Sequence, residues 1–121
     1  MEDFPFPNLP FQKREKKPRN KGINYVRAPV IVGQCINDYL SAYGSLVDIF
    51  KLSGKQAAMM SRSSLVDFIS TCKKHDVLVA VGNPVMDVAL SGGAEVVDSY
   101  LDSVSKYEID IIEISSIARS I

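Results

Sequence analysis

The residues best suited to chemistry each stand at the C-terminal end of an apolar segment of the sequence. In chain order they are Arg27, Lys51, Asn83 and Glu113. Lys51 lies in the segment V-D-I-F-K-L-S-G, where it shares one side with Ile49. A strand that is buried on both faces cannot carry a charge without a partner, a ligand or a water-filled opening. In such an opening an ammonium group can hold a phosphate or carboxylate and stabilise charge that develops on an enolate.

Glycine-containing turns follow the second and third apolar segments. Ser53 with Gly54, and Gly82 with Asn83, can present backbone N–H groups to an anion, or can serve only to make tight turns. Gly54 and Lys55 do not form a phosphate-binding loop of the Walker kind, because the required earlier glycine and the following Ser or Thr are absent.

Arg27, Lys51 and Glu113 each have a structural alternative to a role in binding or catalysis. Arg27 can clamp a carboxylate or phosphate through two N–H groups, or can pair with Glu113 at the end of the sheet. Lys51 can instead be a surface lysine whose stem covers apolar neighbours. Glu113 can take a proton, or can be merely the counter-ion of Lys51 or Arg27.

Strands and helices alternate in the predicted secondary structure. Short segments rich in β-branched residues predict four strands, over residues 23–27, 47–52, 77–81 and 110–115. Apolar stripes at helical spacing predict three main helices between them, over residues 36–43, 65–75 and 97–104, with one or two further turns over 85–90. This repeat of βαβ units predicts an α/β fold with a parallel sheet and right-handed crossovers.

Doubly wound sheets and α/β barrels both begin with this alternation. Polar residues at the ends of successive strands favour the barrel, because those ends form the mouth of its active site. In an open sheet the ligand usually sits at one switch point. A TIM (β/α)8 barrel has eight strands and about 250 residues, so four strands predict its N-terminal half. The last strand would then leave an open apolar edge, which implies either a homo-oligomer of two copies or a fragment of a longer protein.

Composition limits the class of protein and its partners. The chain has 121 residues, 46% of them hydrophobic, and a formal net charge of zero, as expected for one soluble domain without an electrostatic preference for nucleic acid or membrane. No apolar run could span a bilayer, and the N-terminus is not a signal peptide. Cys35 and Cys72 are predicted to be free and largely buried, and the protein to be cytoplasmic. The single histidine, His75, is predicted to be structural.

Residues 1–22 are predicted to be a disordered basic and proline-rich tail, preceding a barrel region over residues 23–121. Six basic residues and one acid lie between positions 13 and 21. Such a run is either a nucleic-acid or localisation patch, or a solvated lead-in to the first strand. We favour the solvated lead-in.

Four segments in fixed order resemble the phosphosulfolactate synthase family. They read K-P-R-N-K-G-I-N-Y-V, V-D-I-F-K-L-S-G, K-K-H-D-V-L-V-A-V-G-N and I-D-I-I-E-I-S. The resemblance runs from about Lys17 to Ser115, and the ordered set is more specific than any one segment. Family members are α/β barrels. The archaeal enzyme adds sulfite to phosphoenolpyruvate with magnesium, and a eukaryotic branch, whose Arg-Ser-Pro is similar to residues 27–29 here, includes plant heat-stress-associated proteins.

The resemblance implies an enzyme of the carbon–sulfur lyase class acting on a small anionic substrate such as phosphoenolpyruvate. Its implied catalytic residues are Lys51 and Glu113, with Glu113 also a magnesium ligand, and its implied substrate-binding residues are Arg27, Ser53, Gly54, Gly82 and Asn83. Barrel phosphate sites are frequently built from the loops after strands seven and eight. The 121-residue chain by itself is therefore predicted to be inactive. The alternative is a non-enzymatic stress-tolerance protein built on the same barrel.

Overall fold

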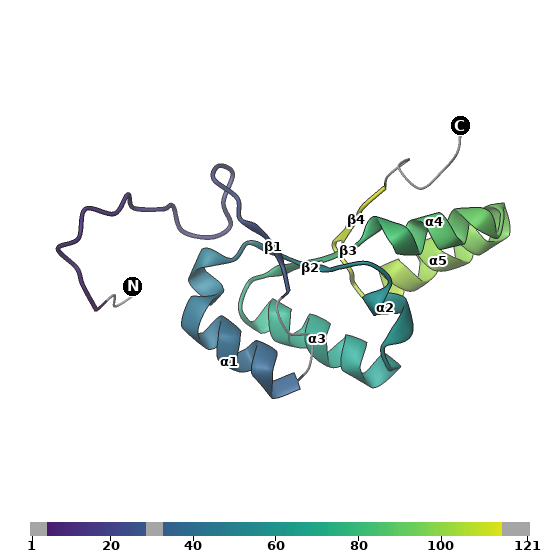
Figure 1. The fold of residues 1–121 in the computed structure, drawn as a ribbon, viewed down its shortest axis with the longest axis horizontal. Coiled ribbons are helices and arrows are strands. Elements are labelled where there is room, and N and C mark those ends of the chain that lie inside the picture. Colours follow the sequence, from purple (N-terminus) through teal and green to yellow (C-terminus); the bar gives the residue numbers. More distant parts are fainter. Residues whose placement is uncertain (1–4, 29–32, 115–121) are drawn as a thin grey trace.

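The computed structural model describes residues 5–28 and 33–114, in which strands and helices alternate (Figure 1). The strands are β1 (Tyr25–Arg27), β2 (Ile49–Leu52), β3 (Leu78–Val81) and β4 (Ile111–Ile112). The helices are α1 (Gly33–Tyr43), the 3-10 turn η1 (Gly44–Leu46), α2 (Gln56–Met59), α3 (Arg62–Lys74), α4 (Asn83–Ser91) and α5 (Ala94–Lys106). The predicted α/β class and all four strands are confirmed. The predicted loop after β2 instead contains the short helix α2. Ser115, with which the predicted fourth strand ends, lies outside the described residues.

The order of the strands distinguishes the two α/β architectures. The sheet runs β1-β2-β3-β4, and each strand pairs in parallel with the one that precedes it in the chain. In a doubly wound sheet the strand order reverses at a switch point, whereas a barrel adds each new strand beside the last. The described residues therefore form a partial barrel wall, as the sequence predicted.

The outer face of the sheet carries the hydrophobic core. The side chains of Phe50, Val79 and Val81 are almost completely buried, and α1 and α3 lie together on one side of the sheet (Figure 1). The ring of Phe50 lies 5.7 Å from that of Tyr39 on α1 and 6.4 Å from that of Phe68 on α3, measured between centroids. Alternation along the strands thus directs one set of side chains toward these helices.

The inner face of the sheet is not covered by a helix in the part of the chain that is described (Figure 1). Tyr25, Ile49 and Leu78 stand side by side across three strands on this face. Tyr25 and Leu78 remain 44% and 47% exposed, respectively. In a complete barrel such residues form the packed interior. The homo-oligomer that could cover this face stays a prediction.

Helix α3 shows how the sequence determines an element locally. Ser61 is its N-cap, and the Ser61 side chain accepts a hydrogen bond from the Ser64 N–H. Lys73 and Lys74 occupy its last turn, where positive charge favours the helix dipole. Just beyond that turn, a ring nitrogen of His75 lies 3.1 Å from the Asn37 side-chain oxygen on α1, in keeping with a structural histidine.

The two cysteines differ in environment. Cys72 is fully buried on α3, and burial, followed by the charge of Asp110, raises the pKa of its thiol to about 12. This confirms its predicted place in the core. The prediction that Cys35 is buried was wrong: this thiol is exposed near the start of α1, because the apolar stripe of that helix begins one residue later, at Ile36.

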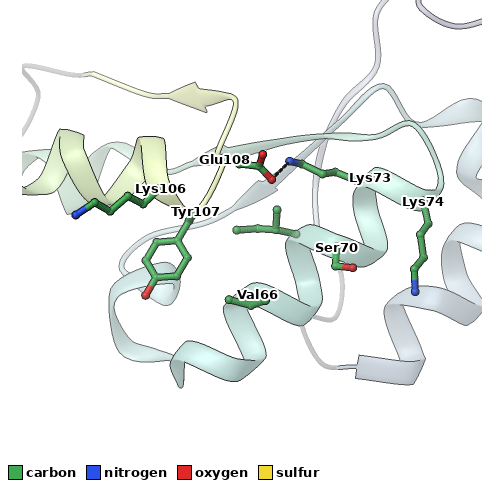
Figure 2. Close-up of a pocket in the computed structure, with 8 residues that line it drawn as sticks. Val66, Ser70, Lys73, Lys74, Lys106, Tyr107 and Glu108 are labelled. Carbon is green, nitrogen blue, oxygen red and sulfur yellow. Dashed lines mark hydrogen bonds and ion pairs between the residues drawn. The ribbon is translucent and has the colours of Figure 1, made fainter.

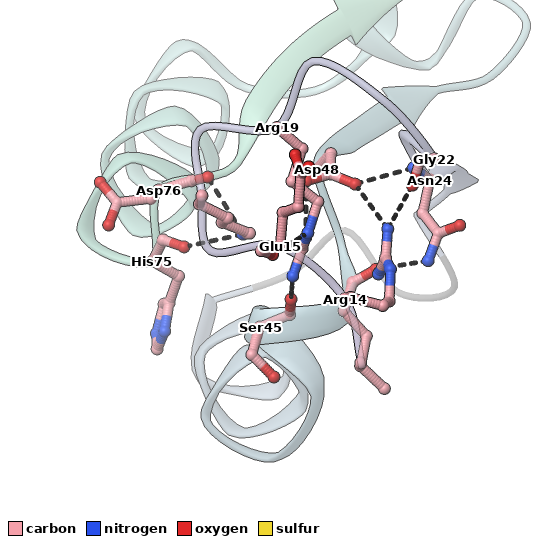
Figure 3. Close-up of polar contacts among 11 residues, drawn as sticks. Arg14, Glu15, Arg19, Gly22, Asn24, Ser45, Asp48, His75 and Asp76 are labelled. Carbon is pink, nitrogen blue, oxygen red and sulfur yellow. Dashed lines mark hydrogen bonds and ion pairs between the residues drawn. The ribbon is translucent and has the colours of Figure 1, made fainter. Parts of the chain in front are cut away.

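The basic segment before β1 lies against the residues that precede β2 and β3, among them Asp48 and Asp76 (Figure 3). We call residues 14–24 the N-terminal clamp. Arg19 and Arg14 contact Asp48, the residue before β2, at 2.7 and 3.2 Å, and the Asn24 N–H donates to the same carboxylate at 2.8 Å. Burial alone raises the pKa of Asp48, but the Asn24 N–H and the two guanidinium groups outweigh it and hold that pKa below its ordinary value.

Lys17 completes the clamp at the end of α3. Its ammonium group donates to the backbone carbonyl oxygens of His75 and Asp76, at 3.2 and 3.1 Å. The expectation of a purely solvated lead-in was therefore wrong for Arg14, Lys17 and Arg19, because each finds an acceptor that is far away in the sequence. The remainder of the predicted tail and its boundary at residue 22 stay predictions.

Among the described residues, no helix has both the length and the apolar character needed to cross a membrane.

Candidate active site at the C-terminal edge of the sheet

Charged side chains meet at the C-terminal edge of the sheet. Arg27 on β1 stands beside Lys51 on β2 in the strand register. Glu113 follows β4, and its backbone N–H donates to the carbonyl of Val81, the last residue of β3. The Lys51 Nζ lies 2.6 Å from the Glu113 Oε1, and the two side chains are 23% and 26% exposed. The structure thus brings together both residues predicted to be catalytic.

Glu113 also affects Tyr25, which no pattern in the sequence marks as a candidate for the site. Its pKa is raised to about 12, first by burial of the hydroxyl and then by the negative charge and hydrogen bonding of Glu113. Strands β1 and β4 are three strand spacings apart, or about 14 Å in a flat sheet at ~4.8 Å per spacing. The effect of Glu113 on the pKa of Tyr25 is in keeping with a sheet that curls toward its inner face, as a barrel wall does.

Arg27 lies at the same edge of the sheet but does not form the ion pair with Glu113 that was the alternative to a role in binding. Glu113 pairs with Lys51, and within residues 5–28 and 33–114 no ion pair of Arg27 is present. The Arg27 side chain is exposed. Its guanidinium group is therefore accessible to an anion at the mouth.

The turns after β2 and β3 lie directly against each other. Gly54 has a φ of +58°, in the left-handed region that glycine adopts without strain. The Gly82 N–H donates to the Leu52 carbonyl at 2.9 Å, so this N–H is used within the sheet and is not free for an anion. The Ser53 hydroxyl is buried and has no hydrogen-bond partner among the described residues. A buried hydroxyl of this kind calls for a water molecule or a ligand.

Gly82 is required for the close approach of the two turns. A Cβ atom at this position would lie 3.0 Å from the Gly54 backbone nitrogen and 3.2 Å from the Leu52 carbonyl oxygen. We expect Gly82→Ala to lower the free energy of unfolding by about 1–3 kcal/mol, the usual cost of overpacking. Urea unfolding followed by circular dichroism measures this. Gly44→Ala is the control, because its Cβ would make only ordinary contacts, the nearest at 3.5 Å. Equal effects of the two substitutions would contradict the expectation.

Helix α4 begins at Asn83, immediately after β3, so its N-terminus lies at the same edge of the sheet. No side chain caps it: Gly82 occupies the N-cap position, and a proline follows in the first turn. A helix N-terminus carries partial positive charge and unsatisfied N–H groups. The Asn83 N–H can therefore add to the anion-binding character that Lys51 and Arg27 give this edge.

Two cavities lie away from the mouth. The larger, about 520 Å³, lies between α3 and the end of α5 (Figure 2). One of its lysines, Lys73, is already paired with Glu108 at 2.5 Å. The other cavity, about 420 Å³, lies between the N-terminal clamp and the N-terminal ends of β2 and β3. The mouth itself is open, because a partial wall does not enclose it.

Comparison with protein-family models identifies the relationship. Residues 12–121 match the model described as (2R)-phospho-3-sulfolactate synthase (ComA). The chain belongs to this family. A search of curated proteins gave no significant match. The family match supports a phosphosulfolactate synthase-like, lyase-type function on an α/β barrel. It does not support the non-enzymatic stress-tolerance alternative.

The magnesium ion implied by the resemblance to the phosphosulfolactate synthase family can be tested against the donor set. Within the described ranges, no three His, Cys, Asp or Glu side chains gather into a metal-binding group. At the mouth, Glu113 supplies a carboxylate whose Oε1 faces Lys51. Mg²⁺ usually keeps several waters and takes only one or two carboxylates, with substrate phosphate oxygens as further ligands. The described residues therefore fit a magnesium ion only as one that a substrate also ligates.

Proposed function

We propose that this edge of the sheet binds phosphoenolpyruvate, or a closely related phospho-enol, in a phosphosulfolactate synthase-like reaction with sulfite. The observation that carries the proposal is the Lys51–Glu113 pair, at 2.6 Å, on the strand ends where barrel enzymes hold their substrates. The family match supplies the reaction class.

The substrate would be held through its negative charges. Lys51, Arg27 and the N-terminus of α4 offer three positive groups at one edge, and the unpartnered Ser53 hydroxyl offers a donor between β2 and β3. The planar guanidinium of Arg27 suits two oxygens of a carboxylate, whereas the Lys51 ammonium suits a phosphate oxygen or a developing enolate. Electrostatic groups that are already in place stabilise charge as it forms.

The bond changes define what these residues must do. The sulfur lone pair of sulfite attacks the methylene carbon of phosphoenolpyruvate, and the electrons of the C=C bond move onto the carboxylate as an enolate. The enolate then takes a proton at the carbon that bears the phosphate, which gives phosphosulfolactate. Arg27 and Lys51 would stabilise the enolate, and the Lys51 ammonium, paired with Glu113, would supply the proton. A magnesium ion ligated by Glu113 would add further charge stabilisation.

Replacing Lys51 by methionine is the direct test. Methionine keeps the length of the side chain and removes its charge, so we expect phosphoenolpyruvate binding to weaken at least ~10-fold, as for loss of a charged hydrogen bond. Isothermal titration calorimetry or ³¹P NMR titration measures this. Lys55→Met is the matched control, because Lys55 is exposed four residues further along the chain. Equal affinities of the two variants would rule out Lys51 as a binding residue.

We also propose that the 121-residue chain does not turn over its substrates. Its described residues supply four strands, whereas barrel phosphate sites are frequently formed by loops after strands seven and eight. Incubation with phosphoenolpyruvate, sulfite and Mg²⁺ is expected to give no new ³¹P signal of phosphosulfolactate. Formation of that product by the purified chain would show that these four strands suffice.

A further inference from the structure

The Lys51–Glu113 ion pair spans a whole strand. Lys51 stands on β2 and Glu113 follows β4, so β3 lies between them. Two strand spacings separate their backbones by about 10 Å in a flat sheet. The charged ends are nevertheless 2.6 Å apart. Both side chains must therefore lean over β3 to meet, and whatever β3 presents beneath them must be small.

That residue is Ala80. It pairs in register with Lys51 on one side and with Ile111, two residues before Glu113, on the other. Two residues earlier on the same strand and the same face, Leu78 is 47% exposed, whereas Ala80 is completely buried. Since no helix within residues 5–28 and 33–114 covers this face, the described side chains that can cover Ala80 belong to the sheet itself, and the Lys51–Glu113 pair meets above it.

Within the described residues the buried Glu113 Oε1 has no hydrogen-bond partner, and the Lys51 ammonium group lies 2.6 Å from it. The position of this carboxylate oxygen therefore depends on the contact that Lys51 makes with it across β3.

We infer that Ala80 is a positioning residue for the Lys51–Glu113 pair. Ala80 leaves the space in which the two side chains meet. This inference deepens the proposed function and rests on it for its catalytic meaning, but the geometry can be tested without any activity.

The rate at which Lys51 is acylated reports on the pair. An ammonium group that is covered and held in an ion pair reacts more slowly with acetic anhydride than a free lysine. Peptide mass spectrometry of the full chain measures this rate for each lysine separately. We expect Ala80→Val to raise the Lys51 rate about two- to fivefold, the range that corresponds to a partly exposed ion pair.

Matched variants separate positioning from general loosening of the fold. Glu113→Gln should raise the Lys51 rate as much as Ala80→Val does, and Ala80→Gly, which keeps the space, should leave it unchanged. Lys55, which is exposed, and Lys73, which pairs with Glu108, should keep their rates in every variant. If Ala80→Val unfolds the chain, all lysines will react faster, and Ala80→Cys, whose side chain is smaller than that of valine, then decides the question.

A Lys51 rate that equals the wild-type rate in a folded Ala80→Val variant, or in Ala80→Cys where Ala80→Val does not fold, would overturn the inference. Protection of Lys51 by added phosphoenolpyruvate tests the proposed function separately. If the substituted variants free Lys51 but phosphoenolpyruvate does not protect it, the positioning role stands and the proposed function fails. If phosphoenolpyruvate protects Lys51 while the substitutions have no effect, the reverse holds.

Discussion

Replacing Asp48 by alanine is expected to lower the free energy of unfolding by about 3–5 kcal/mol, the usual cost of breaking a buried ion pair by removing one partner. The Asp48 carboxylate is only 8% exposed and accepts from Arg19, Arg14 and the Asn24 N–H. Its removal leaves the Arg19 guanidinium, whose side chain is 5% exposed, without its carboxylate partner. Urea unfolding at neutral pH measures the loss.

The control for Asp48 is an exposed acid in a weak pair. Asp102 lies 4.0 Å from Lys106 on the surface of α5, and both side chains are more than three-quarters exposed. Asp102→Ala should therefore change stability by less than about 1 kcal/mol. If Asp48→Ala were no more destabilising than Asp102→Ala, the N-terminal clamp would contribute nothing to stability.

The pH dependence gives a second check on Asp48. Its folded-state pKa lies below its ordinary value of about 3.9, so folding favours the ionised form. The stabilisation is therefore fully present above that ordinary value and is lost as the pH falls through the folded-state pKa. The difference in stability between the wild type and Asp48→Ala should accordingly shrink in acid below about pH 4.

Replacing Phe50 by alanine is expected to cost about 3–5 kcal/mol of stability, as for other buried aromatic residues. Phe50 has no exposed surface and lies between Tyr39 on α1 and Phe68 on α3. Its removal leaves a cavity where both helices contact the sheet. Thermal or urea unfolding monitored by circular dichroism measures the effect.

Leu78→Ala is the matched control for Phe50. Both are large apolar residues on neighbouring strands, but Leu78 is 47% exposed on the inner face. We expect its removal to cost less than half as much as that of Phe50 in the 121-residue chain, because less apolar surface returns to water. A larger loss for Leu78→Ala would mean that the inner face is covered in solution, for instance by a second copy.

The sequence predicted the fold because its signals are local. Alternation along V-D-I-F-K-L placed Phe50 and Lys51 on opposite faces, and the strand register confirms that difference. Serine at position 61 and the lysines at the end of α3 are standard signals for the ends of a helix. The prediction that the polar residues at successive strand ends share one edge of the sheet required only that the strands be parallel.

Contacts between distant segments could not be predicted in the same way. Arg14 and Arg19 belong to a basic run whose composition is typical of a solvated segment, and nothing local indicates that Asp48 is their partner. Glu113 pairs with Lys51 rather than with Arg27. This choice depends on the curl of the sheet and on the small size of Ala80. Tyr25 reads in the sequence only as a strand residue, because its proximity to Glu113 arises across three strand spacings.

The sequential order of the strands also bears on how this protein can be made. Each strand pairs with the one synthesised just before it, so every βα unit leaves the ribosome with its sheet partner already present. The clamp obeys the same rule, since Arg14 and Arg19 precede Asp48 and find it as soon as the start of β2 emerges. The Lys51–Glu113 pair is the exception, because it must wait until the end of β4. The contacts at the N-terminal end of the sheet can therefore form early in synthesis. The ion pair at its C-terminal edge, where we propose that the substrate binds, forms last.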